Sequence, residues 1–101
     1  MKVRNVAMMS DIPIDLSKVK KGNIDKEVLR AGIIAELDAI NLYEQLAEMT
    51  ENKDIKKVIL DIAKEEKTHV GEFQTLLLML DKQQLEELKA GKIEVEKELG
   101  K

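Results

Sequence analysis

The chain has 101 residues, no cysteine and a formal net charge of -3, although 37% of its residues are charged. This length allows one domain, and the lack of cysteine excludes disulfides, thiolate zinc sites and cysteine-held iron–sulfur clusters. The charges are interspersed, without the basic stripe of a nucleic-acid surface, and no apolar run approaches the roughly 20 residues of a membrane span. We therefore expect a cytoplasmic protein with no nucleic-acid and no membrane partner.

The first 50 residues divide into an arm and a helix. Residues 1–22 show no clean period, and Pro13 favours extended backbone there, so we expect an irregular N-terminal arm. From about Ile24 to Thr50, apolar residues recur at spacings of 3, 4 and 7, which predicts a helix. Asn23 or Asp25 could cap its start.

A short polar connection follows, and a second long helix is expected from about Asp54 to Leu80. Asp81, with Gln84 three residues later, resembles a capping box that begins a short third helix. Gly91 is a natural residue to follow the end of that helix. Residues 23–91 would thus form a helical hairpin with a short third helix, and residues 92–101 a charged tail.

The predicted fold class is all-α. Two helices joined by a tight loop lie antiparallel, but one hairpin leaves part of its apolar stripe in water. Helices gain most of their stability by packing that stripe. We therefore expect a homo-oligomer in which two hairpins dimerise into a four-helix bundle.

Three polar residues interrupt the apolar stripes. Glu36 has only small or apolar helical neighbours, and Glu66 lies among Ile62, Ala63 and Val70, with His69 three residues later. The adjacent Glu65 shares its face with polar residues and should point to solvent.

A bound metal ion is the simplest way to offset the free-energy cost of turning these carboxylates inward. A buried carboxylate costs several kcal/mol unless it is paired or binds a metal, and no Lys or Arg on either stripe is placed to pair with it. Counted from the loop, Glu36 and Glu66 differ in level by only roughly 3 Å, and His69 is within about one turn. The three residues should therefore meet, and their oxygen and imidazole donors suit iron or manganese, with zinc as a substitute.

The hairpin offers half of a known ligand set. Dinuclear carboxylate bundles use a Glu from each of two helices and a Glu-x-x-His from each of the other two. A two-fold dimer of this chain would complete that set. A Glu-x-x-His alone is common by chance on charged helices, and a lone His is usually structural, so the prediction depends on all three residues together.

The stretches from Ile33 to Glu44 and from Glu65 to Phe73 resemble the encapsulated ferritins and the ferritin-like domain that some archaea fuse to an encapsulin shell protein. The resemblance covers about residues 25–99. It implies a ferritin-like dimer with a di-iron centre at its interface and five dimers in a decameric ring. It also implies a ferroxidase that stores iron inside an encapsulin nanocompartment, with the encapsulin shell protein as partner.

By this resemblance, Glu36, Glu66 and His69 are the iron ligands and catalytic residues, with zinc, manganese or calcium as possible substitutes for iron. Tyr43, seven residues after Glu36, would support the ligands, although it is equally well explained as half-buried core. Some members carry metal-attracting acidic residues one before and two after the first ligand. Here these positions are Ala35 and Asp38, so only Asp38 could serve metal entry.

Two other functions stay open. One is a rubrerythrin-like protein that reduces peroxide at a di-iron site, although such proteins carry a cysteine-ligated iron domain and this chain has no cysteine. The other is a structural helical module for oligomerisation or cargo attachment, without catalysis. The sequence does not decide whether the domain is fused to a shell or travels as free cargo.

Overall fold

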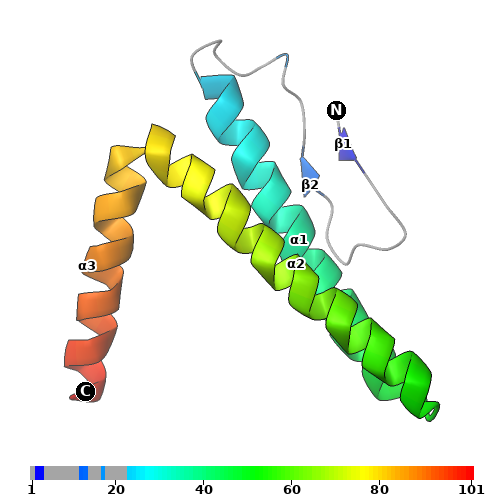
Figure 1. The fold of residues 1–101 in the computed structure, drawn as a ribbon. Helices are drawn as coiled ribbons and strands as arrows, with labels where there is room; N and C mark the ends of the chain where they lie inside the picture. The colour runs from blue at the N-terminus through cyan, green and yellow to red at the C-terminus, as the bar shows by residue number, and fades with distance from the viewer. Residues whose placement is uncertain (1, 4–11, 14–16, 18–22) are drawn as a thin grey trace.

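The computed structural model describes residues 2–3, 12–13, 17 and 23–101, and in the last of these ranges it has three helices (Figure 1). Helix α1 spans Ile24–Met49, α2 spans Lys53–Leu80 and α3 spans Lys82–Leu99. The first two form a long antiparallel hairpin, while α3 turns away from it at the open end. The expected all-α class is confirmed. Among the described residues, no helix has the length and apolarity needed to cross a membrane.

The hairpin turns over three residues, and its polar side chains determine where α2 begins. Thr50 has extended backbone and ends α1. The side-chain Oδ1 of Asn52 accepts hydrogen bonds from the backbone N–H groups of Asp54 and Ile55, each at 3.0 Å. Asn52 is therefore a true N-cap. At the other helix, Asn23 occupies the expected N-cap position of α1, but its side chain makes no capping hydrogen bond.

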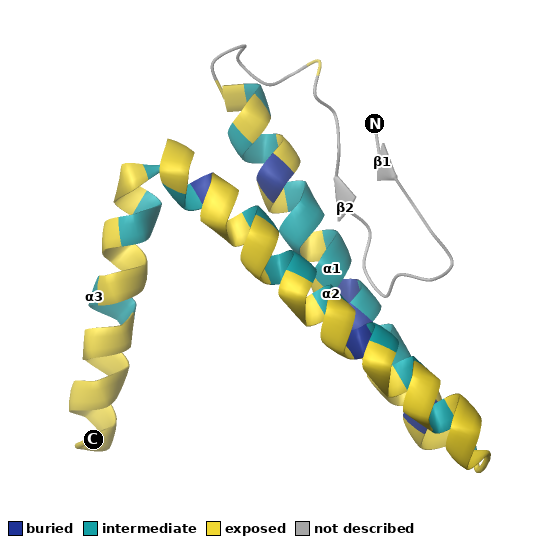
Figure 2. Ribbon diagram, viewed as in Figure 1, coloured by how far each residue is buried: buried dark blue, intermediate teal, exposed yellow. Residues whose placement is uncertain are grey.

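The core of a single chain is thin. Its buried apolar residues are Leu29, Ile40 and Ala47 from α1, and Ala63 and Leu77 from α2. Figure 2 shows only scattered buried positions along the two hairpin helices, whose other positions are intermediate or exposed, and it shows α3 as mostly exposed with a few intermediate positions. One hairpin thus packs a single seam between its two helices and leaves much apolar surface uncovered.

The third helix is longer than expected. The prediction that it ends before Gly91 is wrong, because α3 continues through Gly91 to Leu99. It ends at Gly100, whose backbone is left-handed with φ 68°. Glycine adopts that conformation without the steric cost of a Cβ atom. A glycine inside a helix costs only about 1 kcal/mol relative to alanine, so Gly91 does not stop the helix.

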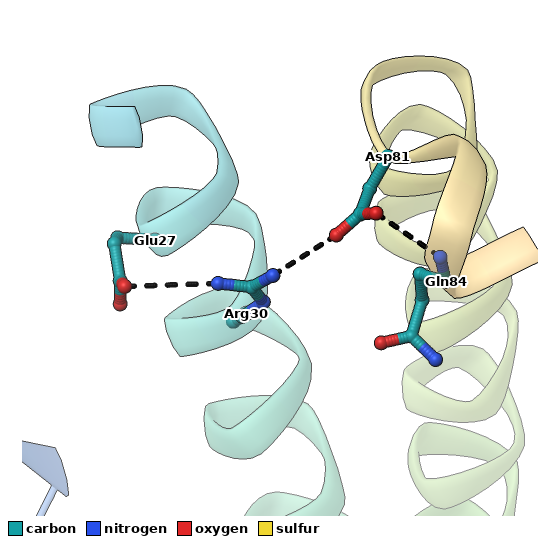
Figure 3. A network of polar contacts seen from close by, with 4 residues as sticks. All are labelled: Glu27, Arg30, Asp81 and Gln84. Atoms are coloured by element: carbon teal, nitrogen blue, oxygen red, sulfur yellow. Dashed lines mark hydrogen bonds and ion pairs between the residues drawn. The ribbon is translucent and has the colours of Figure 1, made fainter. Parts of the chain in front are cut away.

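Asp81 fixes the break between α2 and α3 (Figure 3). Its Oδ1 accepts the backbone N–H of Gln84 at 3.0 Å, as the capping-box pattern predicts, and its Oδ2 accepts Arg30 Nη2 at 3.0 Å. Arg30 also lies 3.6 Å from Glu27 on its own helix. The backbone hydrogen bond from Gln84, aided by the positive charges of Lys26 and Arg30, lowers the pKa of the Asp81 carboxyl. One carboxylate thereby ties the start of α3 to α1.

Most of the expected irregular arm, residues 1–22, lies outside the described residues. Its described part contains a minimal antiparallel pair, in which β1, Lys2–Val3, is matched to β2, Ile12–Pro13. The strand β2 lies beside α1.

Candidate metal centre

The structure brings together the three residues that the sequence singles out. Glu36 on α1 and Glu66 and His69 on α2 each direct one donor atom into a common point, and these atoms lie within 4.8 Å of one another. The Nδ1 atom of His69 is 3.4 Å from Glu66 Oε2 and 3.5 Å from Glu36 Oε2. Both carboxylates therefore converge on the same ring nitrogen.

The two glutamates are more enclosed than the histidine. Each glutamate side chain is 19% exposed, whereas the His69 side chain is 44% exposed. The Oε2 atom of Glu36 is buried and has no hydrogen-bond partner, since the 3.5 Å separation from His69 is too long for a well-formed hydrogen bond. A buried acceptor without a donor costs free energy in the metal-free protein.

The charged neighbours of the cluster are engaged elsewhere or face solvent. Lys67, next to Glu66 in sequence, donates to Glu44 on α1 at 2.8 Å, so its charge is directed to the outside of the hairpin. Glu65 is exposed, as expected from its polar helical neighbours. The expected difference in exposure between Glu65 and Glu66 is therefore confirmed.

An apolar stripe extends from the cluster along α2. It contains Ile55, Val58, Leu76 and Leu80, which lie 7, 11 or 14 residues from His69 and hence on its face of the helix. Between 49% and 60% of each residue is exposed in the single chain. The three donors thus lie on an open apolar face rather than in a closed pocket.

The other predicted residues occupy different surroundings. Tyr43 is half-buried two turns from Glu36, and its supporting role stays a prediction. Asp38 is buried, with 9% exposure, and it makes an interaction within the chain. It lies two residues from Glu36, which places it near the opposite side of α1 from the donors. Its role in metal entry also stays a prediction.

One close contact beside the cluster was not anticipated. The ring of Phe73 lies directly against Gly32, so a Cβ atom there would fit only if the ring moved by a few tenths of an ångström. The sequence carries a weak signal for it: Gly32 is an isolated glycine inside a strong helical pattern, and such a glycine often has a packing reason.

The donor set fits a metal ion. Two carboxylates and an imidazole are the ligands that iron, manganese and zinc accept in proteins, and a cation at their meeting point would satisfy the unpartnered Glu36 Oε2. One chain supplies only three donor residues, however, on a face open to a further molecule. In residue type, these three donors match half of the ligand set of a dinuclear carboxylate bundle.

Comparison with known proteins places the chain in a family. The model of the rubrerythrin family matches residues 27–99. The chain is 58% identical, over 74 residues, to a ferritin-like–encapsulin shell fusion protein of Pyrococcus furiosus, a match covering 73% of this chain and 21% of the relative. It is 41% identical, over 56 residues, to the encapsulin nanocompartment cargo protein EncC of Myxococcus xanthus, covering 55% of this chain and 43% of the relative.

A solved structure agrees with these relatives. The crystal structure of the encapsulated ferritin domain from Pyrococcus furiosus matches with a TM-score of 0.79 and 46% sequence identity, over 89% of this chain and 97% of that domain. The chain is thus similar to nearly the whole of a ferritin domain. It spans only about a fifth of the fusion protein and less than half of the cargo protein.

Proposed function

This chain belongs to the rubrerythrin family as an encapsulated ferritin domain, and on that premise we propose that it oxidises Fe(II) at a di-iron centre shared between two subunits. The observation that carries the proposal is the cluster of Glu36, Glu66 and His69, with donor atoms within 4.8 Å of one another. The buried and unpartnered Oε2 of Glu36 supports it. Burying this carboxylate oxygen without a hydrogen bond costs free energy, and a bound cation would offset that cost.

The open face supports a site that two subunits share. Two copies of the chain would contribute two Glu36, two Glu66 and two His69, which is the ligand set of dinuclear carboxylate bundles. The same association would cover the exposed apolar stripe that includes Val58 and Leu76. Burial of apolar surface is the main favourable term in protein association, so one interface would bury the stripe and complete the centre.

The residues of the chain have distinct parts in the proposed reaction. When bound, the iron pair supplies the redox chemistry, with each Fe(II) giving one electron to an oxidant such as dioxygen. Glu36 and Glu66 offset the charge of the iron, and their enclosed carboxylates hold it in surroundings less polar than water. His69 directs Nδ1 toward both carboxylates, so this atom would be the one to bind iron, and an imidazole must be free of a proton at the atom that binds a metal.

The relatives suggest where the product goes. One is named as a fusion to an encapsulin shell and the other as cargo of an encapsulin nanocompartment. We therefore propose an encapsulin shell protein as partner, a cytoplasmic location inside that shell, and storage of the ferric product in its lumen. The predicted decameric ring of dimers is part of the same proposal. Iron retained per particle, measured after co-production with a shell protein, tests the storage role.

The test of the ferroxidase is the rate of ferric absorbance after Fe(II) is added in air. Glu36→Ala, Glu66→Ala and His69→Ala should each reduce the rate toward that of buffer, because each removes a ligand. Glu65→Ala is the matched control and should leave the rate nearly unchanged, because Glu65 is exposed and is not one of the three convergent donors. Elemental analysis should find about one iron per chain in the wild type, the ratio of a di-iron centre in a dimer.

Each contrary result has a definite meaning. Equal damage from the Glu65 and Glu66 substitutions would show that the enclosed carboxylate is not the one that matters. If all three ligand variants oxidised iron as fast as the wild type, the non-catalytic helical module would be the better description.

A second candidate, peroxide reduction, is favoured by the match to the rubrerythrin family model. It uses the same residues but a different oxidant. Anaerobic mixing of the Fe(II)-loaded protein with hydrogen peroxide, compared with mixing with dioxygen, distinguishes the two. A ferroxidase that uses dioxygen should turn over in air without added peroxide. A peroxide reductase should oxidise its iron much faster with peroxide than with dioxygen.

A further inference from the structure

Gly32 and Phe73 form an unusually close contact between the two hairpin helices. A Cβ atom placed on Gly32 would lie 3.1 Å from Phe73 Cε1 and Cζ, and 3.2 Å from Cδ1. Such separations are shorter than ordinary van der Waals contact between carbon atoms. A Cβ atom at this position would force the ring to move back by a few tenths of an ångström, so glycine allows the closest approach of the ring to α1.

The contact lies one helical turn from the metal cluster on both helices. Gly32 precedes Glu36 by four residues, and Phe73 follows His69 by four. Residues four apart are neighbours on one face of a helix. Because α1 and α2 are antiparallel, both members of the pair lie on the same side of the cluster, the side away from the hairpin loop.

On the side of the cluster toward the loop, the larger side chain comes from the other helix. One turn toward the loop, the buried residues are Ile40 on α1 and Ala63 on α2. There the larger residue belongs to α1 and the smaller to α2, whereas on the far side α1 contributes glycine and α2 phenylalanine. On the two sides of the donors, α1 and α2 therefore contribute the larger and the smaller side chain in opposite order.

We propose that Gly32 and Phe73 act together as positioning residues that set the separation and rotation of α1 and α2 at the level of Glu36, Glu66 and His69. This inference rests on the proposed metal function. A metal site tolerates errors of only about 0.2 Å in its ligand distances, and the supporting residues must hold that geometry. A methyl group on Gly32 would displace the ring by a few tenths of an ångström, which is enough to matter for binding.

The experiment measures binding of Co²⁺ to the full chain, by titration and by the visible absorption spectrum of the bound ion. Gly32→Ala should weaken Co²⁺ binding about tenfold or more, the range seen when residues that orient metal ligands are replaced. It should also change the spectrum, which reports ligand geometry. A contact that matters only for packing would alter the thermal midpoint of the metal-free protein but not the spectrum.

Two further variants make the test specific. Gly71→Ala is the matched control, because Gly71 is also in a helix, two residues from His69, but a Cβ there meets nothing within 4 Å. It should bind Co²⁺ like the wild type. The double variant Gly32→Ala/Phe73→Leu adds a methyl group on α1 and removes the outer ring atoms on α2. It should bind more tightly than Gly32→Ala alone and recover most of the wild-type spectrum.

The outcomes separate this inference from the function on which it rests. If His69→Ala bound Co²⁺ as well as the wild type, the metal site itself would be wrong. If His69→Ala lost binding but Gly32→Ala kept the wild-type affinity and spectrum, the metal site would stand and the positioning role would be overturned. Equal losses of Co²⁺ affinity in the Gly32 and Gly71 variants would also overturn the positioning role. Should Gly32→Ala not fold, Phe73→Leu alone decides: a helical protein with weakened Co²⁺ binding supports the role, and unchanged binding overturns it.

Discussion

Replacing Glu36 by Met should stabilise the metal-free protein while it abolishes metal binding. The Glu36 side chain is 19% exposed, and its buried Oε2 has no hydrogen-bond partner. A buried polar group without a partner costs about 1–3 kcal/mol. Because this carboxylate is partly exposed, its cost should lie near the lower end of that range. Met has a similar length and no charge, so we expect a gain of about 1 kcal/mol. For a domain of this size, that is a rise of roughly 4–8 °C in the thermal midpoint.

The assay is thermal unfolding followed by circular dichroism at one fixed protein concentration, first with a chelator and then with added metal. Ligand at one hundred times its dissociation constant stabilises a folded protein by about 2.7 kcal/mol, so the wild type should gain a large shift and Glu36→Met none. Glu65→Met is the control: it removes the same charge from an exposed position, should change the metal-free midpoint little, and should keep the metal-induced shift. If Glu36→Met lowered the metal-free midpoint more than the control did, the carboxylate would have a stabilising partner in the metal-free state, and the reasoning would be refuted.

Three other substitutions test the interface, the loop and the third helix. Val58→Asp should shift the protein to monomers in sedimentation and reduce bound iron, because Val58 is 60% exposed and lies on the face of His69. Leu60→Asp is the control and should leave the dimer intact, because Leu60 is 45% exposed on the other side of α2. Asn52→Ala removes the N-cap of α2 and should cost about 1 kcal/mol in urea unfolding; no loss would mean that the cap is dispensable. Asp81→Asn should be less stable than the wild type at pH 7. Because the folded state lowers the pKa of this carboxyl below 3.8, the difference should shrink as the pH falls through that lowered value, and a difference that persisted in acid would exclude the charge as its cause.

The ends of α1 and α2, the two helices with a clear apolar periodicity, were predicted to within a residue or two. The spacing of apolar residues is a direct consequence of 3.6 residues per turn, so α1 and α2 could be read from the sequence. The end of α3 could not, because a glycine is compatible with either a helix interior or a helix end. The choice between Gly91 and Gly100 depends on backbone conformation, and only Gly100 among the described residues has a positive φ.

The convergence of Glu36, Glu66 and His69 was predicted because it needs only two regular quantities, the rise per residue and the position of the loop. Contacts that depend on packing between helices could not be derived in this way. The approach of Phe73 to Gly32 and the hydrogen bond from Arg30 to Asp81 depend on how the helices are rotated and separated. The spacing of apolar residues along the sequence does not determine that rotation or separation. The burial of Asp38 on α1 was likewise not evident from its polar side chain.

The exposure of His69 bears on how binding and assembly are connected. A histidine with Nδ1 already within 3.5 Å of two carboxylates is prepared to bind a metal, yet 44% of its side chain is open to water in the single chain. Water at that face would raise the local dielectric constant and weaken the attraction between the cation and its ligands. If the centre is shared as proposed, the second subunit would exclude that water, add its own ligands and cover the apolar stripe in one step. Metal affinity and dimer affinity would then be thermodynamically linked, because each ligand that the partner supplies strengthens both.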